Sequence, residues 1–278
     1  MAKALHAAGM TVSGLGSLPT LQAQYLAGYR PTDFRHFGIP ADCTLVVYCQ
    51  CLAIRPEQHL PGLEALCEEL LARTPDAPQL RLAYPVTANA FENGPGRQLA
   101  ESAPAKPHCR REMVAAQALM QLHAIAYLSH SRLLPFIIRH GELYGGDTAE
   151  ALAPLPGHLA GCLSLAAAHQ PLQLPGMGMH KRTLTHADDF AQAVAALLSS
   201  EGTFPETIDI PGEAMSLIDY MGAIADHFGV GLEGAENPYS DDYPWGIADR
   251  VLSPRRLNAT IRFKRRYSFL KWLKTQTV

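Results

Sequence analysis

Hydrophobic residues recur along the chain with two spacings, one typical of buried strands and one typical of amphipathic helices. The run from Cys43 to Cys51, CTLVVYCQC, is continuous and rich in β-branched residues, which predicts a strand buried on both faces of a sheet. From Gly62 to Arg73 the apolar residues instead recur every three or four positions, which predicts a helix that ends before Thr74 and Pro75. Met1 to Gly9 is predicted to be the end of a helix closed by its glycine.

The two spacings continue in alternation to the end of the chain. Further strands are predicted at residues 11–15, 80–87, 134–140 and 206–210. Further helices are predicted at residues 112–129, 188–199 and 216–229. The stretch 92–107 is rich in Gly, Pro and Ala and predicts a surface loop. Strands that alternate with helices indicate an α/β fold with a parallel sheet and crossover helices.

Composition narrows the class of protein. The 278 residues are 47% hydrophobic and 18% charged, which is typical of a globular chain and excludes collagen-like, disordered and coiled-coil structures. No apolar run is long enough for a transmembrane helix, and the first residues lack the pattern of a signal peptide. The 6 cysteines are scattered without zinc-site spacing, so we expect reduced thiols in a cytoplasmic protein. The net charge of −3 does not predict a nucleic-acid partner.

Charge is less even at the C-terminal end. From Ser253 to Val278 every charged residue is Lys or Arg. Such a run either binds an anionic ligand, a phosphate group or a partner, or is a solvated basic surface.

Three segments resemble, in order, motifs of the extended short-chain dehydrogenase/reductase family, the nucleotide-sugar epimerases and dehydratases. IRHGELYGG (138–146) is similar to a strand and loop of that family, and GMGMHKRTLTHADDFAQAVAALL (176–198) is similar to a later strand and helix. TIDIPGEAMSLIDYMGAIADHFG (207–229) is similar to the strand and helix that follow. The resemblance covers most of the chain from about Val12 onward.

The resemblance implies a Rossmann-like parallel sheet and a smaller C-terminal lobe. The chain begins inside the first helix of that fold, so we expect the sheet to lack its first strand and the glycine-rich loop that holds a dinucleotide. We expect a Rossmann-like domain at 1–150 and a substrate-type lobe at 151–278, with about 181–212 returning to pack on the sheet. A strand left without its neighbour predicts a homo- or hetero-oligomer.

The catalytic residues that the resemblance implies are a Tyr base, a Lys four residues later, and a Ser or Thr that positions the substrate oxygen. Thr87 falls at the Ser or Thr position, although a Thr at a strand end is also an ordinary β-former. KPHCRREMVAAQALM places His108 at the Tyr position and Glu112 at the Lys position. An imidazole, with a pKa of about 6.5, needs no ammonium partner, and Glu112 could hold a protonated His108. The alternative is two solvated residues in the first turn of a helix.

The residues with which the family binds its substrate are matched better in this sequence than its catalytic residues. Arg182 falls where an Arg of the family meets the ligand diphosphate, and the Arg fork suits phosphate, although a single Arg beside a turn is often a surface residue. Arg139, Tyr144 and Arg250 complete the predicted substrate-binding set. The ligand that this set favours is an anionic small molecule such as a nucleotide sugar.

The cofactor and metal signals are weak. After the second strand of the fold, where the family places an Asp or Arg for the ribose, stand Gly16 and Ser17, and Gly14 to Gly16 is interpreted as a tight turn. We therefore expect no cofactor. His180 and His186 lie close in sequence to Asp188 and Asp189, but this segment matches the helix start of the family, so we expect an aspartate cap and no metal site.

Three functions remain open. The first is an epimerase/dehydratase-like pseudoenzyme with degenerate motifs, which acts as a ligand-binding, structural or regulatory partner. The second is a non-redox enzyme that uses His108, Glu112 and Thr87. The third is an active nucleotide-sugar epimerase or dehydratase, with NAD or NADP, whose true start lies upstream of Met1.

Overall fold

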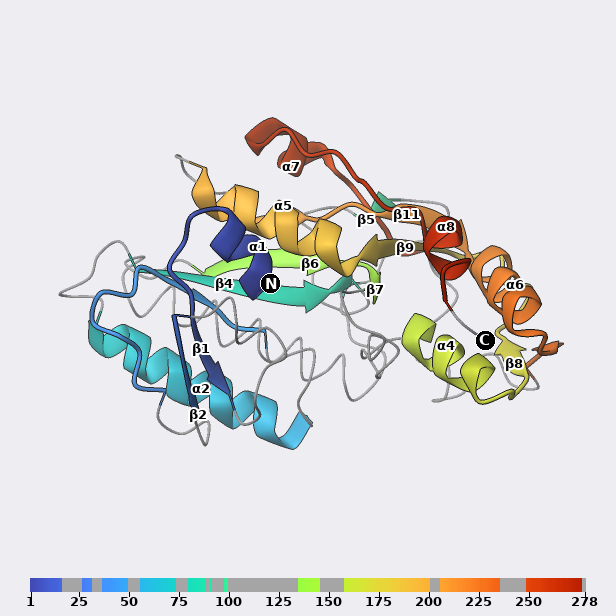
Figure 1. The fold of residues 1–278 in the computed structure, drawn as a ribbon, viewed down its shortest axis with the longest axis horizontal. Helices are drawn as coiled ribbons and strands as arrows, with labels where there is room; N and C mark the ends of the chain where they lie inside the picture. The colour runs from blue at the N-terminus through green and yellow to red at the C-terminus, as the bar shows by residue number, and fades with distance from the viewer. Residues whose placement is uncertain are drawn as a thin grey trace.

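The computed structural model describes residues 1–16, 27–31, 37–49, 56–73, 80–88, 91, 98–99, 135–145, 158–200, 206–235 and 249–276. Within them, a layered α/β body lies at one end and a smaller lobe of helices at the other (Figure 1). Among these residues no helix has the length and hydropathy needed to cross a membrane. The predicted helix 112–129 and most of the predicted loop 92–107 lie outside the described residues.

The body is built on a parallel sheet, which confirms the predicted α/β fold class. Its strands stand in the order β10-β6-β4-β3, and every neighbouring pair is parallel. Their bounds are β3 (Leu45–Val47), β4 (Arg81–Thr87), β6 (Pro135–His140) and β10 (Thr207–Asp209). A separate parallel pair consists of β1 (Ser13–Gly16) and β2 (Gly28–Pro31). Gly14 to Gly16 therefore lies in a strand, and the tight turn expected there is wrong.

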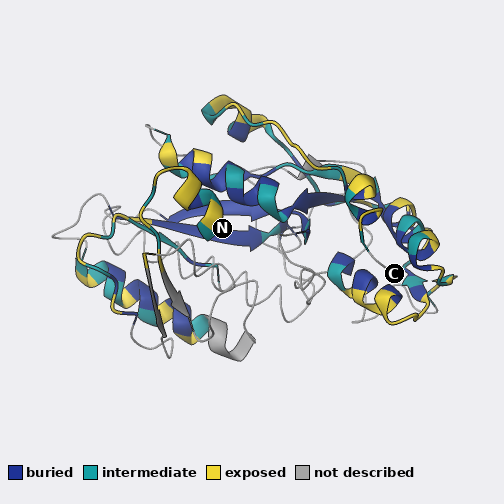
Figure 2. Ribbon diagram, in the orientation of Figure 1, coloured by how far each residue is buried: buried dark blue, intermediate teal, exposed yellow. Residues whose placement is uncertain are grey.

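Helices cover both faces of the four-stranded sheet, whose central strands are buried (Figure 2). On one face α2 (Pro56–Arg73) inserts Leu63, Leu66 and Leu70 against alternate residues of β4. On the other face α5 (Ala187–Ser199) packs Phe190 and its neighbours against β6. Helix α5 begins one residue before its predicted start and ends as predicted. Helix α2 ends at Arg73 as predicted but begins at Pro56, six residues before the predicted start.

The N-terminal helix α1 (Ala2–Ala7) lies beside α5 and ends as predicted (Figure 1). Gly9 has φ +83°, the Gly9 N–H donates to the His6 carbonyl, and the Met10 N–H donates to the Leu5 carbonyl. This pair of bonds is a Schellman motif, which satisfies the last carbonyls of the helix.

The expectation of a long strand from Cys43 to Cys51, buried on both faces, is wrong for strand β3. It pairs only over Leu45–Val47, and its side chains are partly exposed. The ladder with β4 ends with the bond from the Tyr48 N–H to the Ala83 carbonyl. In a parallel ladder the next donor would be the N–H of residue 85, which is proline and has none.

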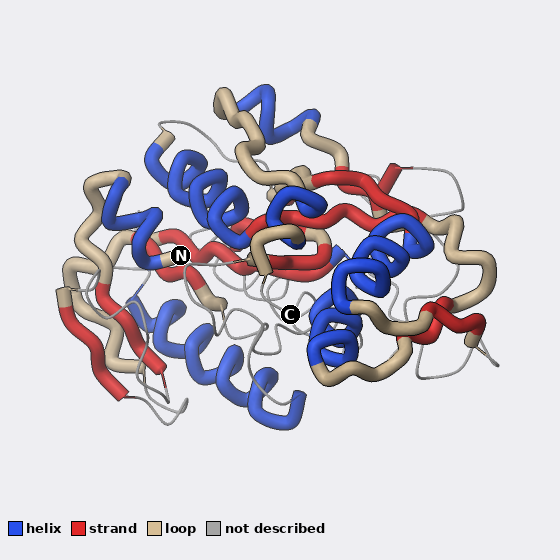
Figure 3. Tube along the Cα trace, turned by 45° about the vertical axis from the view of Figure 1, so that its right-hand side comes forward, coloured by secondary structure: helices blue, strands red, loops and turns tan. Residues whose placement is uncertain are grey.

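The C-terminal lobe packs against a second, mixed sheet (Figure 3). In this sheet β9 (Lys181–His186) pairs parallel with β7 (Glu142–Tyr144) and antiparallel with β11 (Glu213–Ser216). Helices α4 (His158–Ala167), α6 (Leu217–Phe228) and α8 (Phe269–Leu273) enclose its core. Smaller elements are β8 (Leu172–Leu174) with β12 (Leu232–Gly234), β5 (Gln98–Leu99) with β13 (Val251–Leu252), and α7 (Arg255–Thr260) beside β10.

Candidate functional site

The predicted site residues within the described part of the chain lie on strands, except for Arg250, which forms an isolated β-bridge just before β13. Thr87 ends β4 and aligns with His140 on β6, one residue after Arg139. Tyr144 ends β7 and aligns with His186 on β9. His108 and Glu112, the predicted acid–base pair, lie outside the described residues.

Arg182 and Arg250 are brought together by backbone pairing. Arg182 forms a parallel bridge with Arg250, whose N–H donates to the Lys181 carbonyl at 2.8 Å and whose carbonyl accepts from the Thr183 N–H at 3.0 Å. Gly141, two residues after Arg139, lies so close to the Thr183 carbonyl that any side chain there would collide with it. This close approach brings the end of β6 against the strand that carries Arg182.

The side chain of Arg139 makes its contacts inside the fold, with other residues of the chain. It is fully buried, its Nε donates to Asp209 Oδ1 at 2.6 Å, and its guanidinium lies 4.8 Å from the centre of the Phe91 ring. Asp209 Oδ2 also accepts the Ser253 N–H at 3.1 Å. Burial raises the pKa of Asp209, while the Arg139 hydrogen bond opposes that rise. The pair holds β6, β10 and the segment before α7 together.

Arg182 is 2% exposed and lies on the same face of β9 as Leu184, which is part of the lobe core. Its charge lowers the pKa of His158 and of His180 and opposes the rise in the pKa of Tyr220, so these groups lie near the guanidinium. The guanidinium therefore faces the interior of the lobe. The surface position considered for Arg182 is wrong.

A polar cluster that sequence reasoning missed lies beside Arg182. His158 Nδ1 is hydrogen-bonded to the Tyr220 hydroxyl, and Cys162 Sγ lies 3.7 Å from His158 Nε2. Burial, with a smaller effect of the Arg182 charge, lowers the pKa of His158 to about 3, and burial raises the pKa of Cys162 to about 12. Glu142 is the acidic member of the cluster, and its charge raises the pKa of Cys162 and Tyr220.

At neutral pH the imidazole, the phenol and the thiol of this cluster are all uncharged. The cluster can therefore donate and accept hydrogen bonds around a fixed positive charge. The available sequence signal was a polar residue on the apolar stripe of each of two helices, His158 on α4 and Tyr220 on α6.

Tyr144 is covered by the C-terminal segment of the chain. Its ring meets those of His186, Phe269 and Trp272 at centroid distances of 5.2, 5.2 and 5.1 Å. Tyr267 stacks on His186 at 3.7 Å. Burial raises the pKa of Tyr144 above its ordinary range. A ligand would meet Tyr144 only by displacing part of this cover.

The start of α5 differs from the expected aspartate cap. His186 is the N-cap, and its Nδ1 accepts the Asp188 N–H at 3.2 Å. Asp189 instead accepts the backbone N–H groups of Arg266 and Tyr267. In the described part of the chain no His, Cys, Asp and Glu side chains gather as a metal site.

Comparison with known proteins identifies relatives of the fold only. No family model matches the chain. No curated protein matches it in sequence. Solved structures do match, among them UDP-glucose 4-epimerase of Thermus thermophilus in complex with NAD, at TM-score 0.71 and 18% identity over 99% of this chain and 94% of that chain.

Two further structures are similar to the same extent. UDP-glucuronic acid 4-epimerase of Bacillus cereus, in complex with UDP-glucuronic acid and NAD, matches at TM-score 0.72 and 13% identity, over 99% of this chain and 93% of that chain. TunA, an NAD-dependent NDP-hexosamine 5,6-dehydratase involved in tunicamycin biosynthesis, matches at TM-score 0.72 and 18% identity, over 99% of this chain and 91% of that chain. The chain therefore has the fold of the NAD-dependent nucleotide-sugar epimerases and dehydratases.

Proposed function

We propose that this chain binds a nucleotide sugar between the strand ends and the C-terminal lobe, and that it does not carry out Tyr–Lys oxidoreduction. In open α/β sheets, ligands bind beyond the carboxyl ends of the strands. Arg182 is the proposed anchor for the diphosphate, with Thr87 and Arg250 beside it. Tyr144 joins this ligand-binding set when part of its C-terminal cover is displaced. Arg139, through Asp209 and Phe91, holds the strand ends in place.

The observation that carries this proposal is the position of Arg182. Its guanidinium faces the lobe interior beside hydrogen-bonding groups that stay uncharged, and Arg can hold a phosphate with two parallel N–H donors. The compared epimerases and dehydratase act on sugar nucleotides, as their names state.

The catalytic and cofactor residues support the second half of the proposal. His108 and Glu112 stand where the resemblance places Tyr and Lys. At the end of β1, Gly16 has no side chain that could accept the ribose hydroxyls of a dinucleotide. These residues do not fit NAD.

Ligand binding is tested by a thermal-shift screen with UDP-, GDP- and dTDP-sugars. We expect at least one to raise the melting temperature, and Arg182→Ala to weaken its binding ten- to a hundredfold, as the loss of a charge-assisted contact worth roughly 1.5–3 kcal/mol implies. Arg182→Lys keeps the positive charge but loses the two parallel N–H donors. Its affinity for the sugar nucleotide should lie between those of the unaltered chain and Arg182→Ala. Arg81→Ala, an exposed arginine at the other end of β4, is the matched control. The proposal is wrong if no sugar nucleotide stabilises the protein, or if Arg182→Ala responds like the unaltered chain.

The competing function is an active NAD-dependent epimerase or dehydratase, which the NAD complexes among the compared structures favour. Titration calorimetry with NAD(H) and NADP(H) decides between the two. We expect weak or no binding. Low-micromolar affinity for either would contradict the absence of a cofactor site and favour the competing function.

A further inference from the structure

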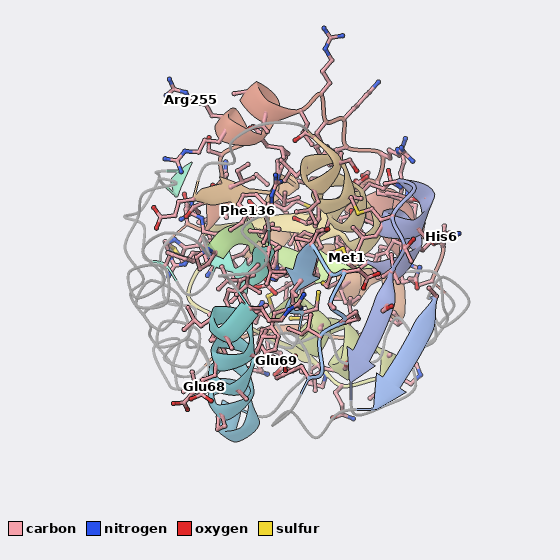
Figure 4. The ribbon with its side chains drawn as sticks, turned by 90° about the vertical axis from the view of Figure 1, so that its left-hand side faces the viewer. Met1, His6, Glu68, Glu69, Phe136 and Arg255 are labelled. Carbon is pink, nitrogen blue, oxygen red and sulfur yellow. The ribbon has the colours of Figure 1, made fainter. Side chains whose placement is uncertain are left out.

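Seven of the basic residues near the C-terminus are exposed, and the segment that carries them is here called the basic ridge. The seven are Arg255, Arg262, Lys264, Arg265, Arg266, Lys271 and Lys274. The ridge follows α7, the extended segment after it and α8 along one edge of the molecule (Figure 1). Arg255 points outward there, at the opposite side from Glu68 on α2 (Figure 4).

The backbone under the ridge is fixed while its side chains face solvent. The carboxylate of Asp189 accepts the N–H groups of Arg266 and Tyr267, and Glu213 accepts the Phe269 N–H at 2.9 Å. Asp189 and Glu213 thus bind the backbone of the ridge, whereas Asp188 forms a hydrogen bond with the side chain of Tyr267. Among the described residues, none of the seven side chains forms an ion pair.

Charge is divided sharply between the ridge and the rest of the chain. The segment 253–278 has 8 basic residues and no acidic one, which leaves 15 basic and 26 acidic residues elsewhere. Within the described part of the chain, this edge is suited to approach an anionic surface, because positive charge is concentrated there while the rest of the sequence carries net negative charge.

We propose that the basic ridge docks on an anionic lipid surface. Two exposed apolar side chains lie among the basic ones, Tyr267 at 36% and Leu270 at 42% exposure. In α8, Phe269 and Leu273 point into the lobe core while Leu270 points outward between Tyr267 and Lys271. Basic residues that flank an outward apolar side chain are typical of segments that lie in the headgroup region.

A nucleic acid fits this surface less well. Proteins that bind single strands stack bases on aromatic faces, and the ridge offers Tyr267, one face of whose ring is already stacked on His186. The aliphatic Leu270 also has no favourable partner along a phosphate backbone.

The proposal is tested by co-sedimentation with phosphatidylcholine vesicles that contain about 30% phosphatidylserine, at an ionic strength of about 0.1 M. We expect binding to these vesicles and none to pure phosphatidylcholine. Each basic residue removed should weaken binding about fivefold. The variant R262Q/K264Q/K271Q/K274Q should therefore lose it. Leu270→Ser should weaken vesicle binding severalfold and leave the melting temperature nearly unchanged.

The control is K3Q/R81Q, which removes two exposed basic residues away from the ridge. The double variant K271Q/K274Q removes the same number of positive charges from the ridge itself. K3Q/R81Q should bind vesicles normally, whereas K271Q/K274Q should bind them more weakly. Equal binding to both kinds of vesicle would overturn the proposal, as would equal weakening by these two variants. If single-stranded RNA binds more tightly than the vesicles and Leu270→Ser changes neither, the ridge is a nucleic-acid surface and the proposal is wrong. None of these outcomes depends on whether a nucleotide sugar binds at Arg182.

Discussion

His140 and His158 are buried histidines held in the neutral form. His140 Nδ1 lies 2.8 Å from the Gly141 carbonyl, to which only a protonated Nδ1 can donate, and the ring packs edge-on to Phe190. Burial lowers the pKa of His140 to about 4, although that carbonyl favours the charged form. In the folded state, burial therefore disfavours protonation of both imidazole rings.

This predicts an acid-sensitive fold in the range between the unfolded and folded pKa values. As the pH falls from about 6.5 to about 4, the unfolded chain takes up protons at these residues and the folded chain does not, so stability falls. His140 alone should account for about 3 kcal/mol over this window. Urea unfolding at several pH values measures it. His140→Gln should flatten the slope, and an unchanged slope in that variant would contradict the assignment.

Gly145 is a second residue with a specific requirement. Its φ is +77°, and a Cβ there would collide with the imidazole of His186. Gly145→Ala should therefore destabilise the fold by roughly 1–3 kcal/mol, since both the backbone and the ring stack are strained. Gly161→Ala, in α4 and with open space around its Cβ position, is the control and should be neutral or stabilising. Equal melting temperatures for the two variants would refute the argument.

The sequence located the arginines of the site but not what surrounds them. Arg139 and Arg182 were found by residue type and motif position. The partner of Arg139 is Asp209, on a strand much later in the chain, and the neighbours of Arg182 come from α4 and α6. Spacing along one segment carries no information on such distant pairings, so burial of these charges was not predictable.

At the scale of elements, strong periodicity predicted bounds well. Helix α6 begins after Ser216, whose hydroxyl accepts the Asp219 N–H, and ends at Gly229 with φ +65°, so both of its end signals are local. Strand β3 was overestimated because its length depends on Pro85 in the neighbouring strand. No reading of CTLVVYCQC alone could show that.

The role of Pro85 can be tested directly. Pro85→Ala supplies an N–H aligned with the Tyr48 carbonyl, so the β3–β4 ladder should extend by one bond. Hydrogen exchange should show a protected amide at residue 85 and slower exchange at Tyr48. Pro61→Ala, at an exposed position of α2, should leave Tyr48 unaffected. Rapid exchange at residue 85 would show that something other than the missing donor ends the strand.

At the scale of the whole molecule, the parallel sheet takes its strands from distant parts of the chain. β9, α5 and β10 follow the lobe helix α4 in sequence, yet α5 and β10 complete the body: β10 pairs with β6, and α5 covers Phe136 and Ile138. The division into domains at 1–150 and 151–278, with 181–212 returning to the sheet, stays a prediction. The pairing shows why residues 1–150 should not fold alone.

The late position of β10 has a consequence for synthesis. β6 ends at His140 and its partner strand ends at Asp209, so a ribosome adding about 5–20 residues per second leaves the open edge of β6 exposed for roughly 3–14 s. During that interval the apolar face that α5 will cover is also bare. A nascent chain stalled before residue 207 should therefore bind chaperones and resist protease poorly, and protection should rise once residues 207–209 have left the exit tunnel.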